Sequence, residues 1–157
     1  VLLAGRMSTT GDILPASSVV VRMATAADSE SVLALVAKLG HPVEVDPEIF
    51  TTSFSQVLDD APATMVHVAE HGGAVVGYAL TTVNTLLYTN GTSAQLQEIA
   101  VDDSIQTSGV GTALVRAVED ACEARGVTQL TVASRRAGGF YDRLGYTQQA
   151  EYMRRLF

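Results

Sequence analysis

A short turn in the second half of the chain has the residue types that bind an anion. Residues 106–111 (QTSGVG) join a predicted strand to a predicted helix. Because Gly109 and Gly111 lack a Cβ atom, a ligand can approach their backbone closely. The first amide groups of the following helix have no partner inside that helix, and the helix dipole adds to their attraction for phosphate. The turn is therefore a candidate phosphate-binding site.

Two common phosphate motifs do not fit this turn. A Walker loop needs Lys followed by Ser or Thr after its last glycine, and Gly111 is followed by Thr112 and Ala113. A dinucleotide-binding fingerprint needs a third glycine where Leu114 stands, and it usually opens a domain. Neither motif fits, so the turn is either another kind of phosphate site or a purely structural turn.

The segments on both sides of the turn place it at a helix N-terminus. After it, apolar side chains recur at three- and four-residue steps up to a stop at Gly126, which predicts a helix with one buried face. Cys122 lies on this apolar stripe, so we expect it to be buried. Before the turn, residues 94–101 (AQLQEIAV) predict a strand. Strand, turn and helix follow one another as an anion site of this kind requires.

A second pattern lies downstream, in residues 128–146 (TQLTVASRRAGGFYDRLGY). With the earlier Gln-x-x-Gly-x-Gly, it resembles the GNAT superfamily of acyl-CoA-dependent N-acyltransferases, whose members carry Arg/Gln-x-x-Gly-x-Gly/Ala. Members then have a strand, an Asn, an Ala three residues on, a Tyr seven residues on, and a closing Leu-Gly-Phe or Leu-Gly-Tyr. Ala137, Tyr141 and residues 144–146 stand at the matching positions, and Ser134 stands where the Asn is usual. The resemblance covers residues 19–157.

The resemblance implies acetyl-CoA as co-substrate. The implied contacts come from the end of the strand before the turn, the turn itself, the helix start and the segment after the fifth strand: Ile99, Ala100, Val101, Gln106, Thr107, Ser108, Gly109, Val110, Gly111, Thr112, Ser134 and Ala137. Tyr141 is implied as the general acid toward the CoA sulfur, and the alternative is that its ring only packs under the sheet. Arg135 and Arg136 either meet the CoA phosphates or form a solvated charge pair.

Acetyl transfer to an amine also requires a base, because an amine with a pKa near ~10 must lose a proton before it attacks. Glu98 is the only carboxylate within residues 94–101, so it could take this proton directly or through a water. Strand parity leaves open whether Glu98 faces the acceptor or points away from it. Many relatives also carry an acid at the position of Gln97, so the class of amine stays open.

The resemblance implies an α/β fold with a mixed, mostly antiparallel sheet of six to seven strands, flanked by about four helices and split at the strand ending near Val101. Residues 19–157 are expected to form a single N-acetyltransferase domain, after a flexible leader at 1–18 that could in part come from the expression vector. The predicted strands are 19–23, 65–69, 74–87, 94–101, 130–133 and a final pair within 147–156. The predicted helices are 25–39, 47–58, the one after the turn, and 137–144, which Gly138 and Gly139 should make start late.

Composition limits the partners. The chain has 17 acidic and 10 basic residues and a net charge of −7, which argues against nucleic acid and favours a cationic small substrate. Its one cysteine gives no sign of an oxidising compartment, and its three histidines are not spaced as metal ligands. No apolar run has the length of a membrane helix. We expect a cytoplasmic protein without a metal or membrane partner, and a homodimer is left open.

We therefore expect an acetyl-CoA-dependent N-acetyltransferase that acetylates a primary amine of a small, cationic acceptor by direct attack in a ternary complex. One alternative is an acyl-CoA-binding regulatory domain without turnover. Another is an acetyltransferase for a protein N-terminus or lysine, which would need an open peptide groove. Residues 41–62 and 84–93 would decide between pocket and groove, and their sequence does not say which.

Overall fold

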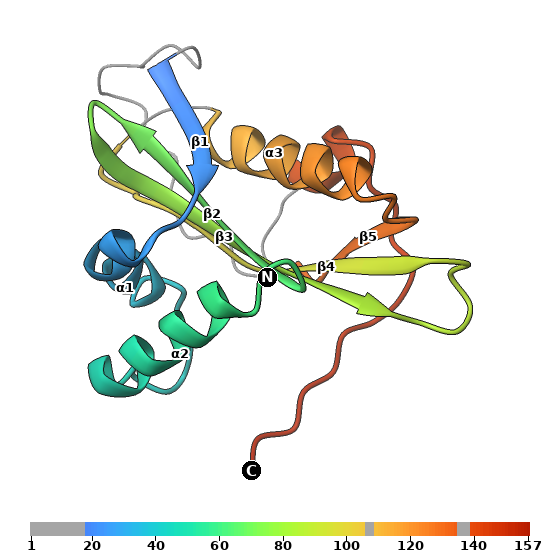
Figure 1. Cartoon of the computed structure of the whole chain (residues 1–157), viewed down its shortest axis with the longest axis horizontal. Helices are drawn as coiled ribbons and strands as arrows, with labels where there is room; N and C mark the ends of the chain where they lie inside the picture. Colours follow the sequence, from blue (N-terminus) through green and yellow to red (C-terminus); the bar gives the residue numbers. More distant parts are fainter. Residues whose placement is uncertain (1–17, 106–108, 135–138) are drawn as a thin grey trace.

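Five strands form one sheet in the order β1-β2-β3-β4-β5 (Figure 1). The computed structural model describes residues 18–105, 109–134 and 139–157. The strands are β1 (Val19–Met23), β2 (Thr64–His71), β3 (Ala74–Thr85), β4 (Thr92–Val101) and β5 (Gln129–Val132). The first three pairings are antiparallel and β4 pairs with β5 in parallel. The sheet is therefore mixed and mostly antiparallel, as expected.

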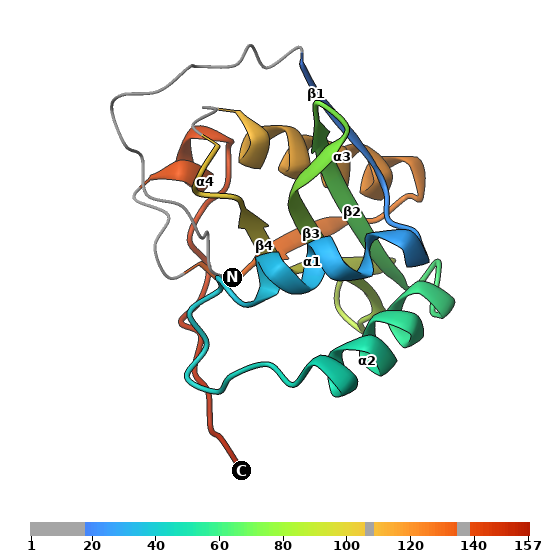
Figure 2. The ribbon, with the colours of Figure 1, turned by 90° about the vertical axis from the view of Figure 1, so that its left-hand side faces the viewer.

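The expected six to seven strands are wrong, because the described residues form five. Residues 147–157, which were expected to add a final pair, take no helical or strand conformation. In Figures 1 and 2 the end of the chain runs away from the sheet, and its Tyr152, Met153 and Phe157 side chains are exposed. A strand forms only where it can pair with the edge of another strand. The residue pattern of the tail could not show whether such an edge lay within reach.

Helices cover both faces of the sheet. On one face lie α1 (Ser29–Val36), which follows a 3-10 turn (Ala26–Asp28), and α2 (Pro47–Asp59). On the other face lie α3 (Val110–Ala124) and α4 (Phe140–Arg143), as Figures 1 and 2 show. α4 starts late, after Gly139 at φ 85°, as expected. α1 stops short of the expected Leu39, because its last turn tightens into i→i−3 bonds such as Leu39 N to Val36 O.

The two faces bury separate cores. The α3 core combines Leu96 and Ile99 of β4 with Val110, Leu114 and Val118 of α3. The other core packs the α1 and α2 side chains, such as Leu35 and Phe54, on Val66, Val68 and Tyr78. Because both faces are covered, β2 is buried from Thr64 to Ala69, with no exposed side.

Two sets of side-chain hydrogen bonds fix the starts of the helical segments on the α1 and α2 face. Asp28 accepts hydrogen bonds from both terminal nitrogens of Arg22, and Arg22 also bonds Glu70 on β2. Asp46 caps α2 by accepting bonds from the Glu48 and Ile49 amides, with Pro47 at the first helical position, as the sequence predicts. The chain from α1 to α2 is therefore anchored at both ends.

Candidate active site

The sheet opens between β4 and β5 halfway along β4. The two strands pair from Ser93 with Gln129 to Leu96 with Val132. From Glu98 to Val101 β4 continues to pair with β3, while its other edge has no strand partner among the described residues. On that edge Ile99, Ala100 and Val101 have no strand partner among the described residues, and the two strands part where the resemblance implied a split.

A cleft of about 980 Å³ fills this opening. Gln97 and Glu98 line it from β4, and Ala133 and Ser134 line it from the segment after β5. Residues of the C-terminal tail, including Tyr152, close another side. Ser134 thus lies beside the opening, whereas Ala137, Arg135 and Arg136 fall outside the described residues.

A β-bulge decides where Glu98 points. On β3, Leu80 pairs with Glu98 and the next residue, Thr81, pairs with Leu96, so Gln97 is an extra residue in β4. Leu96 and Ile99 both pack in the α3 core, although an unbroken strand would turn them to opposite faces. The bulge thereby turns Glu98 to the α1 and α2 face, which the strand pattern of the sequence could not decide.

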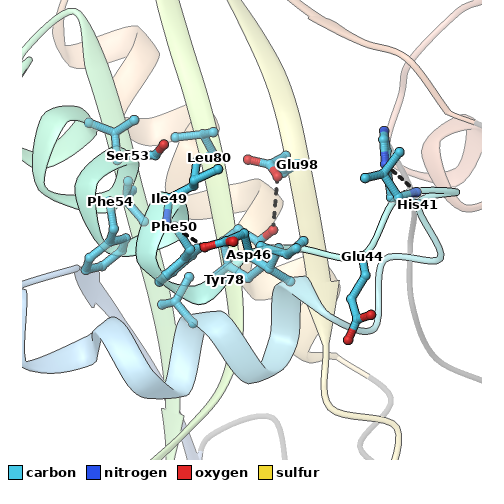
Figure 3. Close-up of a pocket in the computed structure, with 16 residues that line it drawn as sticks. His41, Glu44, Asp46, Ile49, Phe50, Ser53, Phe54, Tyr78, Leu80 and Glu98 are labelled. Atoms are coloured by element: carbon cyan, nitrogen blue, oxygen red, sulfur yellow. Dashed lines mark hydrogen bonds between the residues drawn. The ribbon is translucent and has the colours of Figure 1, made fainter. Parts of the chain in front are cut away.

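Glu98 is held by a buried tyrosine. The Tyr78 hydroxyl donates a hydrogen bond to Glu98 Oε1 at 3.4 Å (Figure 3). Burial raises the pKa of the Glu98 carboxyl above its ordinary value of 4.5, and the Tyr78 bond partly opposes this rise. Burial also raises the pKa of Tyr78, so its hydroxyl stays neutral and can donate. A carboxylate whose pKa is raised is a stronger proton acceptor at neutral pH.

A second, apolar pocket of about 510 Å³ lies against Glu98 on the same face. Figure 3 shows Phe50, Phe54 and Ile49 of α2, Leu80 of β3 and Glu98 of β4 around it. Val36, His41, Val45 and Glu98 line both this pocket and the cleft. The Glu98 carboxylate therefore lies at the junction of the two hollows.

The helix α3 begins within the predicted phosphate turn, at Val110. Gly109 has φ 140°, a conformation that favours glycine, and precedes the first helical residue, Val110. No described side chain caps this helix, and its first turn carries no acidic residue, so the amides of Val110, Gly111 and Thr112 suit a phosphate. Gln106, Thr107 and Ser108 lie outside the described residues.

Tyr141 is buried in the α3 core and lines neither hollow. Its ring makes edge contacts with Phe140 at 5.0 Å and with Tyr146 at 5.6 Å between centroids. Its hydroxyl is buried without a hydrogen-bond partner among the described residues. Burial raises the pKa of Tyr141 to about 12, so the group stays protonated at neutral pH. The Tyr141 ring therefore packs in the core, as the alternative expected. Its hydroxyl is also free to donate a hydrogen bond to an acceptor atom of a bound ligand.

Sequence reasoning missed Tyr78, because a Tyr within a buried strand gives no sign of its partner. His67 is buried on β2 but lines neither hollow, and burial lowers the pKa of its imidazole. Cys122 is buried on α3, as expected, and burial raises the pKa of its thiol. Within the described ranges, no cluster of three or more His, Cys, Asp or Glu side chains could hold a metal ion, and no helix is long and apolar enough to cross a membrane.

The chain belongs to the acetyltransferase (GNAT) family, whose model matches residues 33–146. A transcriptional regulator from Bacillus halodurans C-125 shares the fold at TM-score 0.79 and 21% identity, over 88% of this chain and 99% of that one. A glucosamine-6-phosphate N-acetyltransferase from Arabidopsis thaliana matches at TM-score 0.77 and 17% identity, over 88% and 98%. An aminoglycoside acetyltransferase from an uncultured soil metagenomic sample matches at 0.74 and 18%, over 90% and 96%. Comparison with curated protein sequences found no match.

Proposed function

We propose that the protein transfers an acetyl group from acetyl-CoA to a primary amine of a small acceptor bound in the apolar pocket. The observation that carries this proposal is the position of Glu98, whose carboxylate lies at the junction of that pocket with the cleft beside β4. A base at such a junction meets an amine on one side and an acyl donor on the other. The proximity of two bound reactants can supply much of the rate enhancement.

Four features of the chain suit acetyl-CoA. The free edge of β4 at Ile99, Ala100 and Val101 offers backbone groups to an extended chain. The uncapped start of α3, at residues 109–112, suits the phosphates, and Ser134 offers a hydroxyl beside the opening. The buried Tyr141 hydroxyl is a donor with no acceptor in the part of the chain that the structure describes. Bound there, acetyl-CoA would supply the activated acyl carbon.

Glu98 and Tyr141 would then handle the protons. Glu98 accepts one proton from the acceptor ammonium, which frees the nitrogen lone pair. That nitrogen bonds to the acyl carbon while the C–S bond breaks and the sulfur keeps its electron pair. The Tyr141 hydroxyl donates a proton to the sulfur, and the second proton lost by the nitrogen restores the phenol. The products are an N-substituted acetamide and free CoA, with one proton released through Glu98.

A charged amine is also consistent with the net charge of −7, which attracts cations in solution. The pocket of about 510 Å³ supports an acceptor of small-molecule size.

The test combines binding with turnover. A ligand present at a hundred times its Kd adds about 2.7 kcal/mol of stability, which for a chain of this length raises Tm by about 5–10 °C. We expect this shift with acetyl-CoA and with CoA, followed by release of CoA thiol when primary amines are added. A shift without turnover of any amine would favour an acyl-CoA-binding regulatory domain, and the lack of a shift at millimolar acetyl-CoA would contradict the proposal.

A further inference from the structure

The lining of the pocket beside Glu98 discriminates among primary amines. We propose that the preferred acceptor carries one ammonium group on an apolar alkyl or aryl body, and that polyamines and amino sugars are poor acceptors. This inference rests on the proposed function, because it names the acceptor class of the same site.

The pocket walls are mostly hydrocarbon, and the polar lining residues besides the carboxylates are His41, Ser53 and Tyr78. Valine side chains come from α1, from β2 and from the segment between α1 and α2, and Leu80 comes from β3. Phe50 and Phe54 on α2 form a stacked pair, with ring centroids 5.5 Å apart and planes 16° from parallel. Such walls gain free energy by covering methylene groups or a ring, and they offer few partners to the several hydroxyl groups of a sugar.

Apolar side chains at the rim lack cover. Val43 is 60% exposed and Ile49 is 67% exposed, although both line the pocket. Figure 3 shows Ile49 next to Phe50 and Leu80, on the side of the pocket formed by α2. An apolar acceptor body would remove this surface from water and gain free energy by doing so. A polar body would gain no such free energy from contact with it.

Carboxylates around the pocket are unevenly placed. Glu98 alone comes from the sheet, where Tyr78 holds it. Glu44 and Asp46 lie on the exposed segment before α2, and the Asp46 carboxylate already accepts two amide bonds from that helix. A first ammonium therefore finds Glu98, and among the lining residues a second one finds no other carboxylate except Glu44 and Asp46 at the exposed rim. Burying an unpaired charge is strongly unfavourable.

The size of the pocket limits the acceptor. Its volume is about 510 Å³. Since an apolar cavity of about 150 Å³ holds benzene, this space has room for roughly 20 non-hydrogen atoms at most. A chain of several methylenes or a body of one or two rings would fill it and still leave the amine at Glu98.

The experiment compares pentylamine with 1,4-diaminobutane, which have the same number of non-hydrogen atoms and differ in one terminal group. Acetylation is measured as release of CoA thiol at saturating acetyl-CoA, with glucosamine as a second polar amine. We expect kcat/KM to be at least about thirtyfold higher for pentylamine, and to fall about fourfold for each methylene removed down to propylamine. Equal or faster turnover of 1,4-diaminobutane or glucosamine would overturn the inference and leave the proposed function standing.

A variant at the rim tests the pocket itself. Ile49→Glu adds a carboxylate at the third residue of α2, where glutamate suits the helix start. It should lower kcat/KM for pentylamine about tenfold and raise it for 1,4-diaminobutane. Leu87→Glu is the matched control, because Leu87 is fully exposed and lines neither hollow. Identical effects of the two substitutions would refute the assignment.

Failure of the proposed function has a different signature. If acetyl-CoA stabilises the protein and no amine is acetylated, turnover fails, and the acceptor class is judged by calorimetry alone. Binding of pentylamine that is weakened by Ile49→Glu and unchanged by Leu87→Glu would then support the inference. Absence of pentylamine binding at millimolar concentration would overturn it.

Discussion

Replacing Glu98 with Gln removes the proposed base while leaving the rest of the site in place. The amide has nearly the shape of the carboxylate, and its oxygen can still accept the hydrogen bond from the Tyr78 hydroxyl. An amine with a pKa near ~10 is about one part in a thousand unprotonated at pH 7. The variant must wait for that fraction, so kcat/KM should fall about 100- to 1000-fold at pH 7.

The pH profile separates loss of a base from damage to the site. Burial raises the pKa of Glu98 above 4.5, and the carboxylate form is the active one. Wild-type kcat/KM should therefore rise as pH increases through that raised pKa and then level off. In Glu98→Gln it should keep rising about tenfold per pH unit until the pKa of the amine, so the deficit shrinks at pH 9.

Release of CoA thiol from pH 5 to pH 10 measures both profiles, with an equal Tm as the check on folding. Glu123→Gln, at the exposed end of α3, makes the same charge change outside the site and should behave as wild type. A loss of less than threefold at pH 7, or a Glu98→Gln profile that runs parallel to the wild-type profile, would refute the reasoning.

Two further predictions concern the tyrosine and the ion pair. Tyr141→Phe should keep the ring contacts and the fold but lower kcat about 100-fold or more, with little change in KM. The control is Tyr146→Phe, which removes a hydroxyl bonded to Glu119, and its kcat should stay within about twofold of wild type. Equal losses in the two variants would contradict an acid role. Asp28→Asn should destabilise the fold by about 1–2 kcal/mol at pH 7, because Arg22 lowers the pKa of Asp28 to about 2, from an ordinary value of 3.8. This contribution is fully present above pH 4 and is lost as pH falls through about 2, so the difference from wild type in urea titrations should vanish below that pH. A difference that stays constant with pH would contradict the prediction.

Local patterns were sufficient for α2 and α3, whereas α1 ends earlier than they predicted. The cap at Asp46, the proline after it and the three- and four-residue steps of α2 and α3 are short-range signals, and the helices form where those signals lie. The late start of α4 also follows from local residues, since Gly139 takes a positive φ that other residues avoid. The tail after Gly145 was misjudged because pairing depends on a distant edge that no local pattern encodes.

The sequence by itself determined the family, the order of β4 and α3 on either side of the predicted phosphate turn, and the candidates Glu98 and Tyr141, because these depend on residue types at fixed spacings. Only the tertiary structure decided where Glu98 points, since the bulge at Gln97 arises from the pairing of β3 with β4. It alone also joined Tyr78, α2 and β4 into an apolar pocket. Such contacts between residues far apart in the chain leave no periodicity in the sequence to detect.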